Sequence, residues 1–173
     1  MRITAILRKI VLPLTGVCAV VFAAVQFVPV YAHTNPHVSP EKAIAASIDM
    51  PPQVQAIMRK ACMDCHSDET RWPWYSNVAP MSWLVVRDVE RARKVMNLSE
   101  WSDGLGRKKG RAAGALLAAC EGVKSKRMPL PQYQMMHPEA NLSPDEIDTF
   151  CTWTAAAVHQ IKSSHGVTYT SGK

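Results

Sequence analysis

The sequence lacks the features of a β protein and of a nucleic-acid-binding protein. No stretch of its 173 residues alternates apolar and polar side chains in the manner of half-buried strands. The net charge is +6, but three basic residues lie before residue 33, and the rest of the chain carries 17 basic and 14 acidic residues. So small and dispersed an excess excludes a nucleic-acid footprint. We therefore predict an all-α fold that has no nucleic-acid partner.

Cysteine is scarce, and the five cysteines fall into separate groups. Cys18 lies in an apolar segment, Cys62 and Cys65 are three positions apart, and Cys120 and Cys151 stand alone. A zinc site would need two further ligands at suitable spacing. A thioredoxin-type motif should follow a strand, whereas Cys62 follows a predicted helix. Cys120 and Cys151 form either a disulfide or two separate buried thiols, and both alternatives stay open here.

Charge is absent from residues 10–30, which follow three basic residues. An uncharged run of roughly 20 residues is long enough to cross a bilayer as a helix. Residues 1–32 are interpreted either as an uncleaved signal anchor or as a signal peptide removed after Ala32. The length of the run favours a hydrophobic helix that anchors the chain in the membrane. Both interpretations export everything after residue 32, because the positive flank stays in the cytoplasm.

The exported part is expected to consist of a tether, one helical domain and a tail. Residues 33–50 are the expected tether: residues 33–40 contain two prolines and polar residues typical of an extended linker, and residues 41–50 permit a helix without a clear apolar face. Residues 51–163 form the predicted domain, and the polar residues 164–173 are expected to be a disordered tail. Apolar positions at helical spacing predict the helices of this domain over residues 51–61, 83–96, 108–124 and 144–161.

The strongest chemical pattern is Cys62-Met63-Asp64-Cys65-His66. Each thiol can add across one vinyl group of a porphyrin, and the imidazole after Cys65 then faces the iron. A short helix with an apolar stripe leads directly into Cys62, so all three side chains can reach one flat cofactor. The pattern predicts one haem c, attached through Cys62 and Cys65, with His66 as the proximal iron ligand.

Large aromatic side chains gather in a loop that follows this motif. Trp72, Trp74 and Tyr75 lie in a stretch whose two prolines, Pro73 and Pro80, forbid a continuous helix. A loop with so many rings normally buries them against something, and a haem is one candidate. Arg71 and the indole N–H groups would suit haem propionates. The alternative is a general aromatic core of a small helical domain, and it also stays open.

A second proline-rich loop presents Met128, which lies 62 residues after His66. Prolines on either side of Leu130 predict an extended loop over residues 127–133. A thioether held in a stiff loop can approach the far face of a porphyrin as a sixth ligand. Met128 is the preferred candidate and His137 the next, while the remaining methionines nearby serve equally well as core filling.

Taken together, these residues resemble the haem-binding domain family of small, membrane-anchored bacterial proteins and, more broadly, monohaem class I c-type cytochromes. The shared features are the haem motif with its flanking loops and the Met-Pro segment. The residues that carry the resemblance are Gln26 to Pro29, Asn35-Pro36, Cys62 to Ser67, Thr70 to Ser76, Val78 to Pro80, Asn97, Ser99, Trp101, Met128 to Tyr133, His137 to Ala140, Leu142-Ser143, Glu146 and Trp153.

This resemblance implies a cytochrome-c-like helical domain around one covalent haem. It places the domain on the periplasmic side of the bacterial inner membrane, on a single-pass anchor, or free in the periplasm or secreted if the N-terminal segment is cleaved. It also implies His66 as the proximal ligand and strengthens Met128 as the distal one. The partner it implies is a redox protein whose identity the sequence does not reveal.

Two functions fit these features. With His66 and Met128 on the iron, no position is open for a substrate, which favours one-electron transfer over catalysis. An enzyme would also need an acid or base near the iron, and no His–Arg pair suits that role. The alternative is a haem-based sensor or a peroxidase-like module in which a small ligand displaces Met128.

Overall fold

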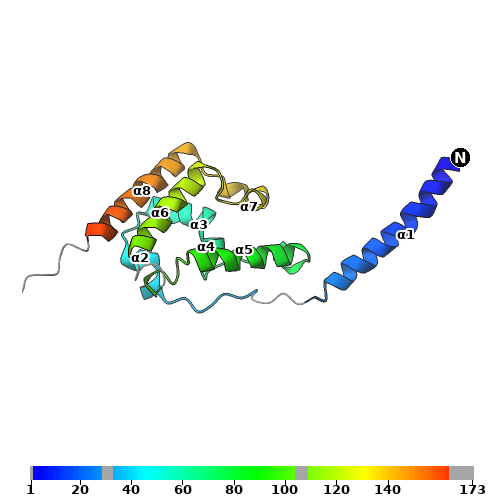
Figure 1. The fold of residues 1–173 in the computed structure, drawn as a ribbon, viewed down its shortest axis with the longest axis horizontal. Coiled ribbons are helices and arrows are strands. Elements are labelled where there is room, and N and C mark those ends of the chain that lie inside the picture. The colour runs from blue at the N-terminus through cyan, green and yellow to red at the C-terminus, as the bar shows by residue number, and fades with distance from the viewer. Residues whose placement is uncertain (1, 29–32, 104–108, 164–173) are drawn as a thin grey trace, which may run out of the picture. The chain divides into compact units, whose positions relative to one another are not determined.

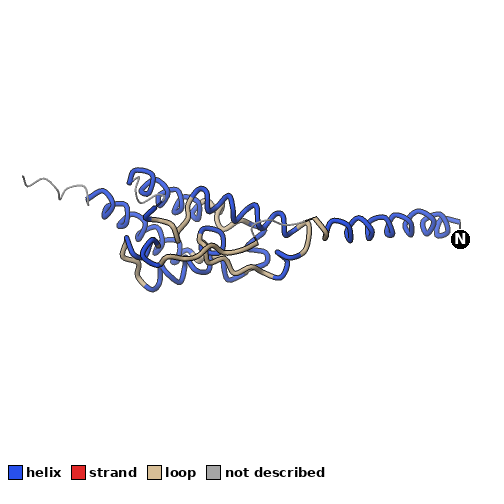
Figure 2. Tube along the Cα trace, turned by 90° about the horizontal axis from the view of Figure 1, so that it is seen from below, coloured by secondary structure: helices blue, strands red, loops and turns tan. Residues whose placement is uncertain are grey.

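The structure is a computed structural model that describes residues 2–28, 33–103 and 109–163. Within these ranges the regular elements are all helices, and no strand occurs (Figure 1). Figure 2 accordingly shows only helix and loop along the described trace. The predicted all-α class is therefore confirmed.

The elements are mostly short helices joined by turns. In chain order they are α1 (Arg2–Val25), η1 (Pro40–Lys42), α2 (Ile44–Ser47), α3 (Pro52–Ala61), α4 (Met63–His66), η2 (Trp74–Asn77), α5 (Met81–Val95), α6 (Lys109–Lys124), α7 (Pro131–Met136), η4 (Pro138–Ala140) and α8 (Pro144–Ser163).

The chain forms two compact units, and one of the three boundaries between them along the chain falls within α5. One unit comprises the described parts of residues 1–34 and 72–88, and the other those of residues 35–71 and 89–173. The haem motif and the Met128 loop belong to the second unit, whereas the aromatic loop belongs to the first. The predicted cleavage site at Ala32 and the predicted tail lie outside the described residues.

The first unit begins with α1, whose described apolar side chains, such as Leu12 and Val20, are exposed. Gln26 joins the end of this segment to the loop before α5, because its side-chain amide both donates to and accepts from the backbone of Ala79. Among the described residues, no helix is both long and apolar enough to cross a membrane. The membrane-spanning N-terminal helix predicted from the sequence is therefore not confirmed; α1 ends at Val25, before the uncharged run does.

The second unit is built on α6 and α8, which lie side by side (Figure 1). A disulfide joins Cys120 of α6 to Cys151 of α8, so of the two alternatives left open by the sequence the bridge is confirmed. Around it, Leu116 and Phe150 are almost fully buried. The apolar stripe of α3 packs against the same core, with Val54 2% exposed. Cys62 therefore directly follows a helix that is held in place by the core.

A capping box, which is visible in the sequence, marks the start of α8. Ser143 and Glu146 form both bonds of a capping box: the Glu146 carboxylate accepts the Ser143 N–H at 2.9 Å, and the Ser143 hydroxyl accepts the Glu146 N–H at 3.2 Å. Lys60 of α3 pairs with the same carboxylate. These contacts hold Glu146 as an anion, and the pKa of its carboxyl is lowered, chiefly by Lys60.

One local expectation is wrong. The segment 127–133 was predicted to be extended throughout, but Pro131 begins the short helix α7. Proline is well suited to the first position of a helix, because its missing N–H has no partner there in any case. The extended part of the loop is therefore shorter, and it comprises only the residues just after α6.

Candidate haem-binding site

The motif folds as one helical turn of its own, after α3 has ended at Ala61. The carbonyl oxygen of Cys62 accepts the backbone N–H groups of Cys65, at 3.2 Å, and His66, at 2.9 Å. The sequence predicted these residues on the last turn of the preceding helix and the bend beyond it. The structure instead places them on a separate turn, α4, with Cys62 at its N-cap and Cys65 and His66 within it.

The two motif cysteines are reduced thiols, in contrast to the bridged pair. Burial raises the pKa of the Cys62 thiol to about 12, and the neighbouring Cys65 adds to the shift. Thiol–disulfide catalysts depend on the opposite, a lowered thiol pKa that supplies thiolate near neutral pH. The raised pKa of Cys62 is the reverse of that pattern.

His66 is oriented by the segment that follows α5. Its ring Nδ1 lies 3.0 Å from the carbonyl oxygen of Met96, and a carbonyl can only accept, so Nδ1 carries the proton. Burial lowers the pKa of His66, which keeps the ring neutral. A neutral imidazole with Nδ1–H bound to a carbonyl leaves the lone pair of Nε2 for a metal, as metal-ligating histidines require. The turn thus fits a haem iron.

Polar residues after the motif fasten it to the same segment. The Leu98 N–H donates to the His66 carbonyl at 2.7 Å. Asn97 donates to the Asp68 carboxylate at 3.0 Å, and the Asp68 N–H donates to the Ser99 hydroxyl at 3.0 Å. Asp68 is only 2% exposed, and a buried carboxylate needs such partners. Asn97 and Ser99 were among the residues that carry the family resemblance, and these bonds explain their presence.

Arg93 is the cation of this network, and sequence reasoning missed it. It lies among the charged residues of α5, whose pattern in the sequence is typical of a solvated helix face, yet its side chain is only 15% exposed. Its guanidinium donates to the Ser67 carbonyl at 2.8 Å and to the Thr70 hydroxyl at 2.9 Å, and it lies 3.4 Å from Asp68. The backbone directly after the motif is therefore held by a buried cation.

Asp64, which lies between the two cysteines, is also engaged. Its carboxylate accepts Arg71 Nε at 3.1 Å and Arg71 Nη2 at 3.0 Å, and the Tyr133 hydroxyl donates to it at 2.7 Å. Burial and the carboxylate raise the pKa of Tyr133, so this hydroxyl stays protonated. In the structure Arg71 binds Asp64 of the motif, and its role as a donor to haem propionates stays a prediction.

Met128 follows α6 in the same unit as the motif. Its N–H donates to the Gly122 carbonyl at 3.0 Å, and its side chain is 41% exposed. The rival methionines lie on α7, where Met135 is 81% exposed. His137 stacks on Tyr133 with ring centroids 4.3 Å apart and pairs with Glu139. The backbone at Met128 is thus hydrogen-bonded to α6, and the ring of His137 contacts Tyr133 and Glu139.

The aromatic loop lies in the other unit, so its predicted contact with haem stays a prediction. Tyr75 is 8% exposed, whereas Trp74 is 72% exposed, so Trp74 is not part of a general aromatic core. Trp72 packs edge-on against His33 with centroids 4.4 Å apart. Its buried indole Nε1 has no hydrogen-bond partner among the described residues, and is a donor without an acceptor.

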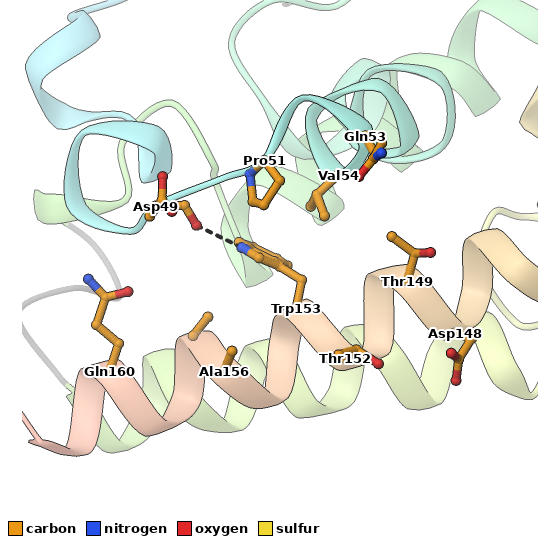
Figure 3. A pocket seen from close by; sticks show the side chains of 11 residues that line it. Asp49, Pro51, Gln53, Val54, Asp148, Thr149, Thr152, Trp153, Ala156 and Gln160 are labelled. Carbon is orange, nitrogen blue, oxygen red and sulfur yellow. Dashed lines mark hydrogen bonds between the residues drawn. The ribbon is translucent and has the colours of Figure 1, made fainter.

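A pocket of about 490 Å³ lies elsewhere in the second unit, between the start of α3 and α8 (Figure 3). Trp153 forms part of its wall, and its indole N–H donates to the Asp49 carbonyl at 2.8 Å. Asp148 and Gln160 stand on the α8 side. None of the predicted haem-site residues lines this pocket, so it is separate from the motif.

The fold and the site define a small helical protein that presents two thiols and a neutral, oriented imidazole on one turn. The chain belongs to the haem-binding domain family, whose family model matches residues 20–156. Comparison with curated proteins and with solved structures gives no match. Family membership establishes the class: this is a haem protein, and haem is the cofactor of its domain.

Proposed function

We propose that this protein is a c-type haem protein that transfers single electrons on the periplasmic side of a bacterial membrane. In this proposal Cys62 and Cys65 hold the haem covalently, and His66 and Met128 are its axial ligands. When bound, a haem with two protein ligands of this kind supplies a one-electron couple without an open position for substrate. The partner is a redox protein.

The observation that carries the proposal is the hydrogen bond from His66 Nδ1 to the Met96 carbonyl. This bond fixes the tautomer of His66 and orients its ring without a bound metal. It leaves Nε2, on the opposite side of the ring from Nδ1, available to the iron. The two reduced thiols lie on the same turn as this ring. An imidazole and two thiols so arranged match the requirements of covalent haem attachment.

The location rests on two independent features. The N-terminal charge pattern, basic residues followed by an uncharged run, is typical of an export segment. In addition, the Cys120–Cys151 disulfide belongs to a class of bonds that persist in oxidising compartments such as the periplasm. We propose that α1 belongs to this export segment and that the second unit works outside the cytoplasm.

Covalent attachment can be tested by removing one thiol at a time. The full chain is produced together with a c-type maturation system, and non-covalent haem is extracted with acid acetone. We expect haem to remain with the wild-type protein, to remain through a single link in Cys62→Ser or Cys65→Ser, and to be lost in the double variant. Cys18→Ser is the matched control, because that thiol lies outside the motif, and it should retain haem fully.

The axial ligand is tested on the same samples. The oxidised wild-type protein should show a sulfur-to-iron charge-transfer band, and Met128→Ala should lose it, while Met135→Ala keeps it. Extraction of all haem from the wild-type protein would overturn covalent attachment. A band that survives in Met128→Ala would overturn Met128 as the ligand.

A sensor is the second candidate, in which a small ligand displaces Met128 from the iron. Carbon monoxide distinguishes the two functions. An electron carrier should leave carbon monoxide unbound in the reduced, folded protein, whereas a sensor should bind it without denaturant.

A further inference from the structure

Asp64 has more partners than a spacer residue of a Cys-x-x-Cys turn needs. It is 8% exposed, and its carboxylate accepts three donors of Arg71: the backbone N–H at 3.2 Å, Nε at 3.1 Å and Nη2 at 3.0 Å. The Tyr133 hydroxyl is a fourth donor, at 2.7 Å. Arg71, which is close to Asp64 in the sequence, already neutralises the charge of the Asp64 carboxylate. The bond to Tyr133 therefore adds a connection between residues that are far apart in the sequence.

That connection ends very close to Met128. Tyr133 lies on α7, five residues after Met128, and its backbone N–H donates to the Leu130 carbonyl at 2.9 Å. On the other side of Met128, the Gly122 carbonyl of α6 accepts the N–H groups of Arg127 at 2.9 Å and Met128 at 3.0 Å. The Met128 loop is therefore held at both ends, by α6 before it and by the motif after it.

The two anchors differ in what they connect. Gly122 fixes the loop to the end of its own helix, with the Cβ and Cγ of Met128 placed 3.5 Å from where a Cβ on Gly122 would lie. The Tyr133–Asp64 bond connects it to the turn that carries both thiols and His66. Of the two, only the second is able to set the distance between Met128 and the haem face.

We propose that the Tyr133–Asp64 hydrogen bond positions the Met128 loop against the haem motif and thereby keeps Met128 on the iron. The inference rests on the proposed function, because it assigns Tyr133 as a positioning residue for the distal ligand proposed there. Tyr133 acts through the loop and does not touch the iron. Loss of the bond removes the direct connection between this loop and the motif, so Met128 competes less well with external ligands.

The test is the displacement of Met128 by imidazole in the oxidised, haem-loaded full chain, followed by loss of the sulfur-to-iron band. Tyr133→Phe removes the hydroxyl and keeps the ring that stacks on His137. A hydrogen bond to a charged group is typically strong enough to shift an equilibrium about tenfold or more. We therefore expect the imidazole concentration at half-displacement to fall roughly tenfold in this variant.

Two control variants separate positioning from general loss of stability. Met135→Leu changes an exposed residue of the same helix and leaves the bond to Asp64 intact. Ser143→Ala removes the cap of α8 and weakens the fold at a distance from the loop. In both variants, imidazole should displace Met128 at the same concentration as in the wild-type protein. An equal shift in Ser143→Ala would overturn the inference.

Asp64→Asn examines the same bond from its other end and serves if Tyr133→Phe fails to fold. The amide oxygen still accepts a hydrogen bond from the Tyr133 hydroxyl but carries no charge, so a shift in the same direction and of smaller size is expected. A Tyr133→Phe protein with wild-type imidazole binding overturns the positioning role alone. A wild-type protein without the sulfur-to-iron band overturns the proposed axial ligand as well, so the two failures are distinguishable.

Discussion

Replacing Arg93 with methionine is expected to destabilise the protein by about 3–5 kcal/mol, the range for removing one partner of a buried ion pair. The guanidinium holds the Ser67 carbonyl, the Thr70 hydroxyl and the Asn35 amide oxygen. Methionine keeps most of the apolar stem but none of these bonds. Asp68, with its side chain 3% exposed, then keeps a buried negative charge without its cation.

Urea unfolding followed by far-ultraviolet circular dichroism measures this effect. Arg91→Met is the matched control, because Arg91 is exposed on the same helix and surface substitutions usually change stability by less than about 0.5 kcal/mol. Equal unfolding midpoints for the two variants would show that Arg93 belongs to the solvated face after all. Burial lowers the pKa of Arg93, and the charge of Asp68 offsets part of this shift.

Removing the disulfide should have an effect of similar size. Cys120 and Cys151 are 31 positions apart, and closing a loop of that length reduces the entropy of the unfolded chain by an amount worth about 3–4 kcal/mol. The double variant Cys120→Ala, Cys151→Ala is therefore expected to melt roughly 10–15 °C lower. Differential scanning calorimetry of the oxidised proteins provides the measurement.

Reductant provides the control within the same experiment. With the bond reduced, the wild-type protein loses the same constraint on its unfolded chain, so its melting temperature should fall to that of the double variant. The thioether links proposed for the haem are not disulfides and should not respond. A wild-type melting temperature that reductant leaves unchanged would contradict the expected contribution of the bridge.

The parts of the fold that the sequence predicted are those encoded by neighbours along the chain. Proline at the first position and a capping box marked the starts of α3 and α8, because these patterns act within a single turn. The Cys62-to-His66 turn was recognised for the same reason. Five consecutive residues determine its chemistry, and their helical conformation needed only local hydrogen bonds.

What the sequence did not predict depends on contacts between distant positions. Arg93 looked like its charged neighbours, and only the approach of residues 67–70 makes it a buried cation. Asp64 and Tyr133 are 69 positions apart, and no spacing rule connects them. The family resemblance had marked Asn97 and Ser99 without indicating their partners. The hydrogen bonds of the network appear only in the folded chain.

The Cys120–Cys151 bridge has one more consequence, which concerns covalent topology. Met128, Tyr133 and His137 all lie between the two bridged cysteines. The segment that carries every candidate distal ligand is thus part of a closed covalent ring. A protease that cuts the chain once anywhere between residues 121 and 150 does not divide the protein into two molecules. The helix α8 stays attached to α6 through sulfur, and the nicked protein keeps all of its ligand candidates.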